Sequence, residues 1–360
     1  MDAELASWVA LQHIPGLGNE GLRRLLQAFG SPQGVTSAPP HALRQIVRPA
    51  VADAIAAGAP EEALAAVAAW LEQPGNTIVT LADADYPQAL LNTADPPALL
   101  YVKGRLELLN RPSLAIVGSR HATPQGIGNA EAFAQSASES GLCIISGLAH
   151  GIDAAAHRGG LAAAGSSIAV VGTGLDKIYP AANRDLAHKL AEHGALISEY
   201  PLGTPPLPAN FPRRNRVISG LSLGCLVVEA NLQSGSLITA RMALEQGREV
   251  FAIPGSIHSP QSKGCHHLIK QGAKLVECAQ DILEELGLAA KKPGQRAMAA
   301  PGAPAAAHPL LEHLDYDPID ADSLCQRSGL TIEALSAILL QLELDGHIAV
   351  LPGGLYQRTT

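Results

Sequence analysis

The fold is decided by the stretch Leu114-Ala-Ile-Val-Gly118-Ser-Arg120, in which four apolar residues run directly into a glycine, a serine and an arginine. A continuous apolar run bounded by glycine predicts a parallel strand that is covered on both faces. Residues 129–140 are apolar-periodic and predict the next helix. In open α/β sheets, backbone N–H groups and helix N-termini at the carboxyl ends of the strands favour anions. We therefore expect Gly118, Ser119 and Arg120 to hold a phosphate group.

Two more predicted strands end in glycine turns. Residues 142–146 run into Gly147, and residues 168–171 run into Gly172 and Gly174. Short apolar strands are also predicted over 195–199, 225–230 and 249–254. Strands and helices alternate from 112 to about 286, which predicts an α/β fold with a doubly wound, Rossmann-like sheet. The repeated turns favour an anion-binding edge over the alternative in which Gly118 only forms a turn and Arg120 is a solvated cation.

Positive charge is concentrated in one segment of an acidic chain. The whole chain has a formal net charge of −8, whereas residues 177–248 contain eight Lys or Arg and five Asp or Glu. The densest part is Phe211-Pro-Arg213-Arg214-Asn215-Arg216. Guanidinium groups match phosphate oxygens and a phenyl ring can stack on a base, so we expect a local nucleic-acid pocket that includes Lys177. The alternative is a solvated charged face, but we expect this cluster to lie among glycine turns, proline and a strand, and not on a polar helix.

A third small-residue turn leads into a predicted helix at Ser234-Gly235-Ser236, which adds another candidate anion site by the same physics. Known nucleotide-binding and catalytic patterns are missing. The chain has neither the G-x-G-x-x-G spacing of a dinucleotide site nor a P-loop. His150, Asp153 and His157 are interpreted as local hydrogen-bonding residues, and Cys265-His-His as a metal-like composition without a partner set. We expect no catalytic residue, metal or cofactor, although Glu199 and Glu229 could act as acids or could bind a base or ribose.

Composition shifts divide the chain. Residues 1–72 predict a helical domain of the SAM or helix-hairpin-helix type, whose Pro-Gly turn at 13–18 either meets DNA phosphates or is a simple helix corner. Residues 76–286 form the extended Rossmann-like domain, and 287–308 read as a flexible Ala/Pro/Gly linker. Residues 309–360 follow the winged-helix pattern, with Thr331 capping a helix that is acidic and apolar. The acidic charge of that helix disfavours direct DNA binding, and a protein contact is the alternative role.

The cysteine pattern and hydropathy indicate the compartment. Five cysteines show no CxxC pairing, so we expect reduced thiols and a cytoplasmic protein. No apolar run free of charge is long enough for a membrane span, and aromatic residues make up 3% of the chain, so wide base-stacking platforms are not expected.

Taken in order, the motifs resemble those of the DNA-processing protein A (DprA/Smf) family. The resemblance rests on motifs that extend from residue 118 to 255: Gly118-Ser-Arg, Ser146-Gly-Leu-Ala-His-Gly-Ile-Asp, Gly172-Thr-Gly-Leu-Asp with Tyr179-Pro, Phe211-Pro-Arg-Arg-Asn-Arg, Ser234-Gly-Ser-Leu-Ile-Thr-Ala and Val250-Phe-Ala-Ile-Pro-Gly. It implies a protein that binds and protects single-stranded DNA and helps to load the RecA recombinase during natural transformation. It also implies competence-linked homologous recombination, a homodimer through the Rossmann-like domain, and no enzymatic activity.

Carried over by position, the resemblance assigns DNA binding to the glycine turns and the basic segment. The implied residues are Gly118, Ser119, Arg120, Gly147, Gly172, Gly174, Lys177, Phe211, Arg213, Arg214, Asn215, Arg216, Ser234, Gly235 and Ser236. Two alternatives remain at this point. One is a Rossmann-like nucleotide-binding or nucleotide-hydrolysing enzyme, although the expected Pro-Gly-Gly-x-Gly-Thr loop is missing from this region. The other is a transcription factor that uses the winged helix, which the acidic charge of its helix disfavours.

Overall fold

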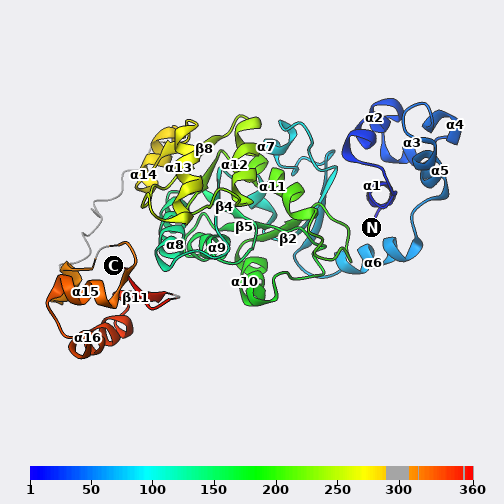
Figure 1. The fold of residues 1–360 in the computed structure, drawn as a ribbon. Helices are drawn as coiled ribbons and strands as arrows, with labels where there is room; N and C mark the ends of the chain where they lie inside the picture. Colours follow the sequence, from blue (N-terminus) through cyan, green and yellow to red (C-terminus); the bar gives the residue numbers. More distant parts are fainter. Residues whose placement is uncertain (289–307, 315, 352, 360) are drawn as a thin grey trace.

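The computed structural model describes residues 1–288, 308–314, 316–351 and 353–359. A helical unit, a central α/β unit and a small C-terminal unit follow one another along the chain (Figure 1). The helical unit contains α1 (Ala3–Gln12), α2 (Asn19–Phe29), α3 (Pro32–Thr36), α4 (Pro40–Leu43), α5 (Pro49–Ala57) and α6 (Glu61–Leu71). Side-chain caps begin two of these helices, because Asp2 accepts from the Leu5 N–H and Ser31 from the Gly34 N–H.

The helical unit packs on one end of the central sheet. Its buried core includes Trp8, Leu25 and Trp70, and it is continuous with Leu99 and Tyr101 of the sheet. The Trp70 and Tyr101 rings meet edge to face with centroids 5.6 Å apart. This shared apolar core fixes the helical unit against the sheet.

The central unit is built on a nine-stranded sheet in the order β1-β2-β6-β5-β4-β3-β7-β8-β9. In this order, each pair of neighbouring strands from β6 to β9 is parallel. Strand β2 is antiparallel to both of its neighbours, β1 and β6. The chain leaves β3 for β4 on one side and returns to β7 on the other, which makes the gap between β3 and β7 a topological switch point. The strands are β1 (Asn76–Thr80), β2 (Leu99–Gly104), β3 (Ser113–Val117), β4 (Cys143–Ser146), β5 (Ser167–Val170), β6 (Ala195–Ser198), β7 (Gly224–Val227), β8 (Glu249–Ala252) and β9 (Lys274–Leu275).

Helices cover both faces of this sheet. Alternate side chains of β3 point to opposite cores: Leu114 and Ile116 join one, and Ala115 and Val117 join the other. The first face carries α8 (Pro124–Glu139), α9 (Ile152–Leu161) and α14 (Ala279–Glu285), and the second carries α11 (Asn210–Leu221), α12 (Ser236–Glu245) and α13 (Lys263–Lys270). The predicted doubly wound, Rossmann-like α/β fold is confirmed. The remaining helical segments are α7 (Gln88–Leu91), α10 (Arg184–His193), η1 (Leu106–Asn110), η2 (Ala181–Asn183) and η3 (Pro260–Ser262).

The C-terminal unit has the predicted winged-helix form. Its elements are η4 (Pro309–Glu312), β10 (Ile319–Asp320), α15 (Ala321–Ser328), α16 (Ile332–Leu344), β11 (Ile348–Leu351) and β12 (Leu355–Arg358), with the strands in the order β10-β12-β11. The first predicted helical pattern is a short 3-10 turn. As expected, Thr331 caps α16 by accepting from the Ala334 N–H at 3.4 Å. Residues 289–307 of the predicted linker lie outside the described residues.

Membrane-spanning potential is limited to one bent pair of helices in the described part of the chain. No single helix there combines the length and apolar character that a span needs, but α5 and α6 together meet those criteria across a 65° bend.

Candidate nucleic-acid interface

The turn after β3 is held by its own backbone and by the turn after β4. Ser119 is 7% exposed, its Oγ accepts from the His121 N–H at 3.1 Å, and its carbonyl accepts from the Ile152 N–H at 3.2 Å. Gly151 has a φ of +73°, and a Cβ there would lie 2.3 Å from the Ser119 carbonyl oxygen. Only glycine fits this close approach. The two turns therefore form one rigid edge from which the exposed Arg120 projects.

An exposed aromatic and cationic group, which we call the outer cluster, lies at this edge. It consists of Arg120, Tyr179 and Phe211, and the exposed side chains of Lys177 and Arg213 come two residues before Tyr179 and two residues after Phe211. The Arg120 guanidinium carbon lies 6.0 Å from the Phe211 ring centroid, and the Tyr179 and Phe211 rings lie 5.6 Å apart at 39°. Arg120, Lys177, Tyr179 and Arg213 are all exposed, and Phe211 is half-buried. Such a surface offers charge for phosphates and ring faces for bases.

The glycine turn after β5 packs against Phe211 of the outer cluster. A Cβ at Gly172 would lie 3.1 Å from Cδ1 of Phe211, so the phenyl ring packs directly on the backbone that follows β5. The Gly172 carbonyl also accepts from the Asn210 side chain at 3.0 Å. Gly174 is buried in the same loop and donates to the Thr204 carbonyl at 3.1 Å. These glycines place the ring of Phe211, and they contribute no side chain of their own.

Arg214 forms a second, buried group with Asp153, which we call the inner pair. Arg214 is 5% exposed, and its Nη1 donates to the Gly147 carbonyl at 2.7 Å and to the Val170 carbonyl. Asp153 accepts from the N–H groups of Gly147 and Ala149 at 3.1 and 3.3 Å. Burial lowers the pKa of Arg214 to about 10 and raises that of Asp153, and each charge opposes the other's shift. Arg214 stays cationic at neutral pH and ties the turns after β4 and β5 together.

The N-terminus of α8, which follows β3, is not free for a ligand. Glu229, at the end of β7, accepts from the Thr123 N–H at 2.9 Å and from the Thr123 hydroxyl at 2.6 Å. Thr123 in turn caps α8 by accepting from the Gly126 N–H at 3.0 Å. The chain's own carboxylate therefore binds the residue that caps α8, whereas the turn Gly118-Ser119-Arg120, where a phosphate is expected, carries no such contact to Glu229.

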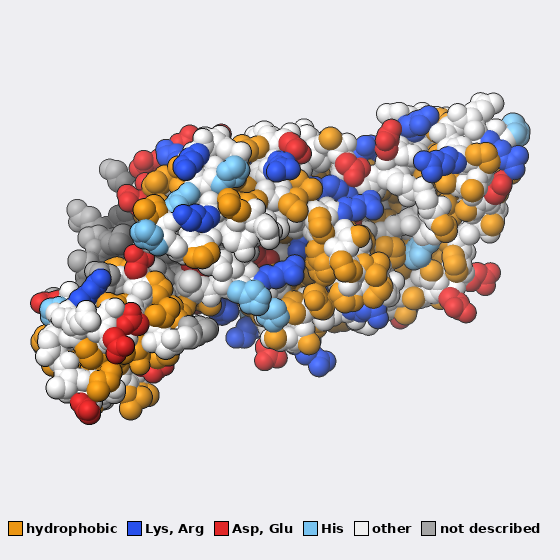
Figure 2. All heavy atoms as spheres, in the orientation of Figure 1, with side chains coloured by type: hydrophobic (Ala, Val, Ile, Leu, Met, Phe, Trp, Pro, Cys, Tyr) orange, Lys and Arg blue, Asp and Glu red, His pale blue; other side chains and the backbone are white. Residues whose placement is uncertain are grey.

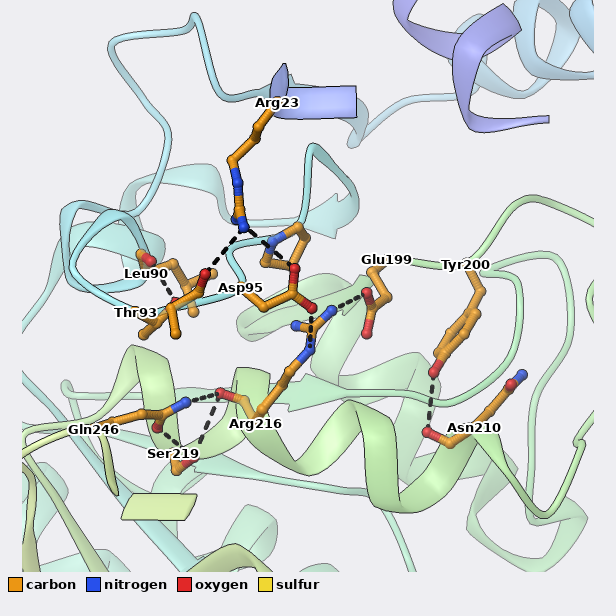
Figure 3. A network of polar contacts seen from close by, with 12 residues as sticks. Arg23, Leu90, Thr93, Asp95, Glu199, Tyr200, Asn210, Arg216, Ser219 and Gln246 are labelled. Carbon is orange, nitrogen blue, oxygen red and sulfur yellow. Dashed lines mark hydrogen bonds and ion pairs between the residues drawn. The ribbon is translucent and has the colours of Figure 1, made fainter. Parts of the chain in front are cut away.

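Arg216 is engaged in a network that reaches the helical unit (Figure 3). It binds Glu199 at 2.5 Å and Asp95 at 3.3 Å. Arg23 of α2 approaches the other oxygen of Asp95 at 3.7 Å and donates to the Ala94 carbonyl at 3.1 Å. Burial raises the pKa of Glu199, with Arg216 the largest opposing influence. Arg216 thus positions α11 relative to α2, with its guanidinium held inside the protein.

The other predicted site residues are spread along the edge. Asn215 is half-buried on α11, and its carbonyl accepts from the Ser219 hydroxyl at 3.2 Å. Ser234 and Ser236 bind each other through their hydroxyls at 2.7 Å, on the far side of β7, where Gly235 begins α12. Gly118 and Gly147 lie in the turns that hold the outer cluster and the inner pair.

The expectation that the arginine cluster avoids a helix is wrong, because Arg213, Arg214 and Arg216 all lie on α11. The signal was present in the sequence: Val217, Ile218 and Leu221 have the spacing of a buried helical face. Helical geometry sends successive residues in directions about 100° apart, which explains why the three arginines have three different environments.

Three contributors were not among the predicted site residues. Tyr179 lies two positions after Lys177, so proximity in sequence could have suggested it. Asp95 and Arg23 could not be predicted from the sequence, because nothing in it places the helical unit beside α11. Within the described residues, no group of three or more His, Cys, Asp or Glu could hold a metal ion.

Figure 2 shows Lys, Arg and His side chains near the middle of the central unit on one face, beside a broad group of apolar side chains, and further Lys and Arg side chains over the helical unit and elsewhere on the central unit.

Comparison with known proteins gives consistent matches. The family model for DNA recombination-mediator protein A matches residues 77–287, and the DprA winged helix domain model matches residues 294–354. Protein Smf of Escherichia coli K12 is 45% identical over 307 residues, covering 82% of this chain and 81% of that protein.

Two solved structures are also similar. The X-ray structure of DNA processing protein A from Streptococcus pneumoniae matches with a TM-score of 0.69 and 40% identity, covering 76% of this chain and 95% of that one. DNA processing protein A from Helicobacter pylori, studied for its single-stranded DNA binding mode, matches with a TM-score of 0.53 and 31% identity, covering 58% and 95%.

Proposed function

Since the chain belongs to the DprA/Smf family of DNA-processing proteins, we propose that it binds single-stranded DNA, with the outer cluster as the binding surface. The observation that carries this proposal is the exposed stack of Arg120, Phe211 and Tyr179 at the carboxyl edge of the sheet. A splayed single strand offers phosphates and free base faces together, whereas the bases of a duplex are already stacked. The description of the Helicobacter pylori relative as a single-stranded DNA binder supports the same ligand.

The deciding experiment measures the affinity of the full chain for single-stranded and duplex DNA of one sequence over a range of salt concentrations. We expect tighter binding to the single strand with little dependence on sequence. The plot of log affinity against log salt should have a slope of about −0.7 for each of roughly two to five phosphates. Equal or tighter binding to duplex DNA would contradict the proposal.

We propose that the protein acts without catalysing a reaction. The two acidic residues considered as acids are committed elsewhere: Glu199 binds Arg216, and Glu229 binds Thr123 at the start of α8. Neither carboxylate belongs to the outer cluster. Incubation of the full chain with single-stranded DNA and with nucleoside phosphates should release no product, and any turnover would favour the alternative of a nucleotide-processing enzyme.

The role of the bound strand is proposed from the family resemblance. In a naturally transforming cell, the protein would shield incoming single strands and help the RecA recombinase to assemble on them. A reconstituted assay follows RecA assembly on strands coated with a single-strand-binding protein. Acceleration by the full chain, and its loss in Arg120→Ala, would support a loading role that depends on the same surface.

We propose that two copies of the chain associate through the edge of the Rossmann-like domain near α13. A groove of about 690 Å³ there is lined by Leu232, Ile257, Ile269 and Leu275, of which Ile257 is 67% exposed and Leu232 61%. Contiguous exposed apolar surface of this kind marks an interaction site. Light scattering should give a dimer for the native chain and a monomer for Ile257→Glu. Leu244→Glu, at an exposed leucine outside the groove, is the matched control.

A further inference from the structure

Two exposed histidines lie beside Arg120, where the turn after β3 meets the turn after β4. His121 follows Arg120 in the chain, and His150 comes directly before Gly151. The backbones of these two turns touch, since a Cβ at Gly151 would lie 2.9 Å from the Arg120 carbonyl oxygen. Each histidine is therefore one residue, about 3.8 Å along the chain, from this contact.

The backbone that carries both histidines is held in place. The His121 carbonyl accepts from the side chain of Gln261, in the loop after β8, at 3.4 Å. The carbonyl of Ala149, just before His150, accepts from the side chain of Asn183 at 3.1 Å. The two imidazole rings are thus attached to an ordered support next to the outer cluster.

Both rings are free to bind a ligand. Within the described part of the chain, neither the His121 ring nor the His150 ring takes part in a hydrogen bond or an ion pair, and both residues are exposed. The local hydrogen bond expected of His150 is therefore not formed. By contrast, His157 of the same motif is buried and pairs with the Ser167 hydroxyl at 2.7 Å.

The charged groups around these rings leave the edge positive. Asp153 is buried beside Arg214 and accepts two backbone N–H groups, and Glu229 is held by Thr123. The other charged or titratable groups near the two turns are Arg184 and Asp185 at the start of α10, and His258 and Lys263 on either side of Gln261. Of these carboxylates, Asp185 is the one without a hydrogen bond or ion pair among the described residues. A protonated imidazole here therefore has few anions of the protein to pair with.

We propose that His121 and His150 are additional phosphate contacts of the single-strand site, and that they bind as imidazolium ions, so that affinity rises as the pH falls from 8 to 6. Histidine is the side chain whose charge ordinarily changes in this range. A phosphate stabilises the charged ring, so binding of the strand takes up protons, and by linkage a higher proton concentration strengthens binding. The inference rests on the proposed function, because it adds contacts to the same surface.

The test measures the affinity of the full chain for an all-thymine single strand at pH 8 and pH 6, at constant ionic strength. Thymine carries no group that titrates in this range. We expect the affinity to rise about fivefold to tenfold on acidification, as two exposed ion pairs would give. The slope of log affinity against log salt should steepen by up to about 0.7 for each added phosphate contact.

Three variants locate the effect. His121→Gln combined with His150→Gln should reduce the rise to less than about twofold. His150→Arg, which is charged at both pH values, should bind more tightly than the native chain at pH 8 and show a smaller rise. His193→Gln is the matched control, because it removes an exposed imidazole just before β6, at the opposite edge of the sheet, and it should keep the native rise.

Melting curves of each protein at both pH values confirm that it is folded. Equal native affinity at pH 8 and pH 6, or an undiminished rise in the double variant, would overturn the inference and leave the proposed function in place. Loss of the rise in His193→Gln as well would also overturn it, since overall charge would then control binding. A folded chain that binds the single strand at neither pH would overturn the proposed function and the inference together.

Discussion

Arg213 and Arg214 are adjacent in sequence and differ in everything that decides their function. Arg213 is exposed, whereas Arg214 is 5% exposed and binds two backbone carbonyls beside Asp153. Within the described residues, Arg213 makes no hydrogen bond or ion pair. Arg214 joins the turn after β4 to the turn after β5. The comparison teaches that the residue types identify a basic segment of the sequence. The direction in which each side chain leaves the helix, and its burial, decide which cation is free to bind a phosphate.

The largest expected effect is on stability, at the inner pair. Arg214→Met removes the bonds to the Gly147 and Val170 carbonyls and leaves the carboxylate of Asp153 buried without its cation. The lost hydrogen bonds to two buried carbonyl groups, together with a buried charge that loses its nearby opposite charge, should cost about 3–5 kcal/mol. Arg213→Met should change the free energy of unfolding by less than about 0.5 kcal/mol, as surface substitutions usually do. Urea denaturation of the two variants measures the difference.

A control tests whether the loss of stability comes from the buried charge of Asp153. Asp153→Asn in the Arg214→Met background removes that charge and should recover part of the lost stability. If Arg214→Met and Arg213→Met unfolded at the same urea concentration, the distinction between the buried and the exposed arginine would be wrong.

The sequence could predict the sheet and the edge where the site lies. The run 114–117 is apolar on both faces because both faces are covered, and its alternation into two cores follows from strand geometry. Glycine turns after successive parallel strands then mark the ligand-binding edge. Arg120 and Phe211 meet at that edge, and local patterns are enough to locate the ends of the strands.

The partners of each polar group could not be predicted, because they come from distant parts of the chain. Glu229 reaches Thr123 across 106 positions, and Arg216 meets Asp95 from another part of the fold. Such pairs depend on how helices pack, which periodicity does not specify. The local sequence signals therefore do not contain the contact of Glu229 with the cap of α8 or the burial of Arg214 and Arg216.

The second effect is on binding, at the outer cluster. Arg120→Ala removes an exposed cation that stacks on Phe211 and should weaken single-strand binding by about 1.5–3 kcal/mol, the value of a charge-assisted contact. The free energy of unfolding should stay within about 0.5 kcal/mol of the native value. Fluorescence anisotropy with a labelled strand measures the affinity.

Arg111→Ala is the matched control, because it removes the same charge from the exposed residue just before β3, at the opposite edge of the sheet. Its affinity should stay close to that of the native chain. An equal loss in both variants would mean that net charge, and not the position of Arg120, controls binding.

A pH effect should distinguish the buried region from the exposed one. Burial lowers the pKa of His157 to about 3, and its Nδ1 pairs with the Ser167 hydroxyl at 2.7 Å. The unfolded chain, in which this imidazole has an ordinary pKa near 6.5, binds an extra proton between about pH 3 and 6.5. Stability from this residue is therefore complete above pH 6.5 and falls with decreasing pH by up to about 1.4 kcal/mol per pH unit.

Urea denaturation of the native chain and of His157→Gln, compared between pH 7 and pH 5, isolates this contribution from those of the buried carboxyl groups. We expect His157→Gln to lose less stability on acidification than the native chain. His150→Gln, at an exposed histidine near the same turn, should follow the native pH dependence. Parallel curves for the native chain and His157→Gln would show that this imidazole is accessible to protons in the folded protein.

The smallest effect is expected from removing the winged-helix unit. Residues 309–360 contain eight Asp or Glu and two Lys or Arg, so most of the chain's net negative charge lies there. Helix α16, which would read DNA in a DNA-binding winged helix, carries Glu333 and Glu343 and no Lys or Arg. A chain ending at residue 308 should therefore bind single strands within about tenfold of the full chain, or 1.4 kcal/mol. At low salt its affinity should rise slightly, because like charge on the tail no longer repels the phosphates.

Glu333→Gln with Glu343→Gln in the full chain should give a smaller change in the same direction. A loss greater than tenfold on truncation would instead place part of the DNA site on the tail, and the outer cluster would then be only one of two binding surfaces.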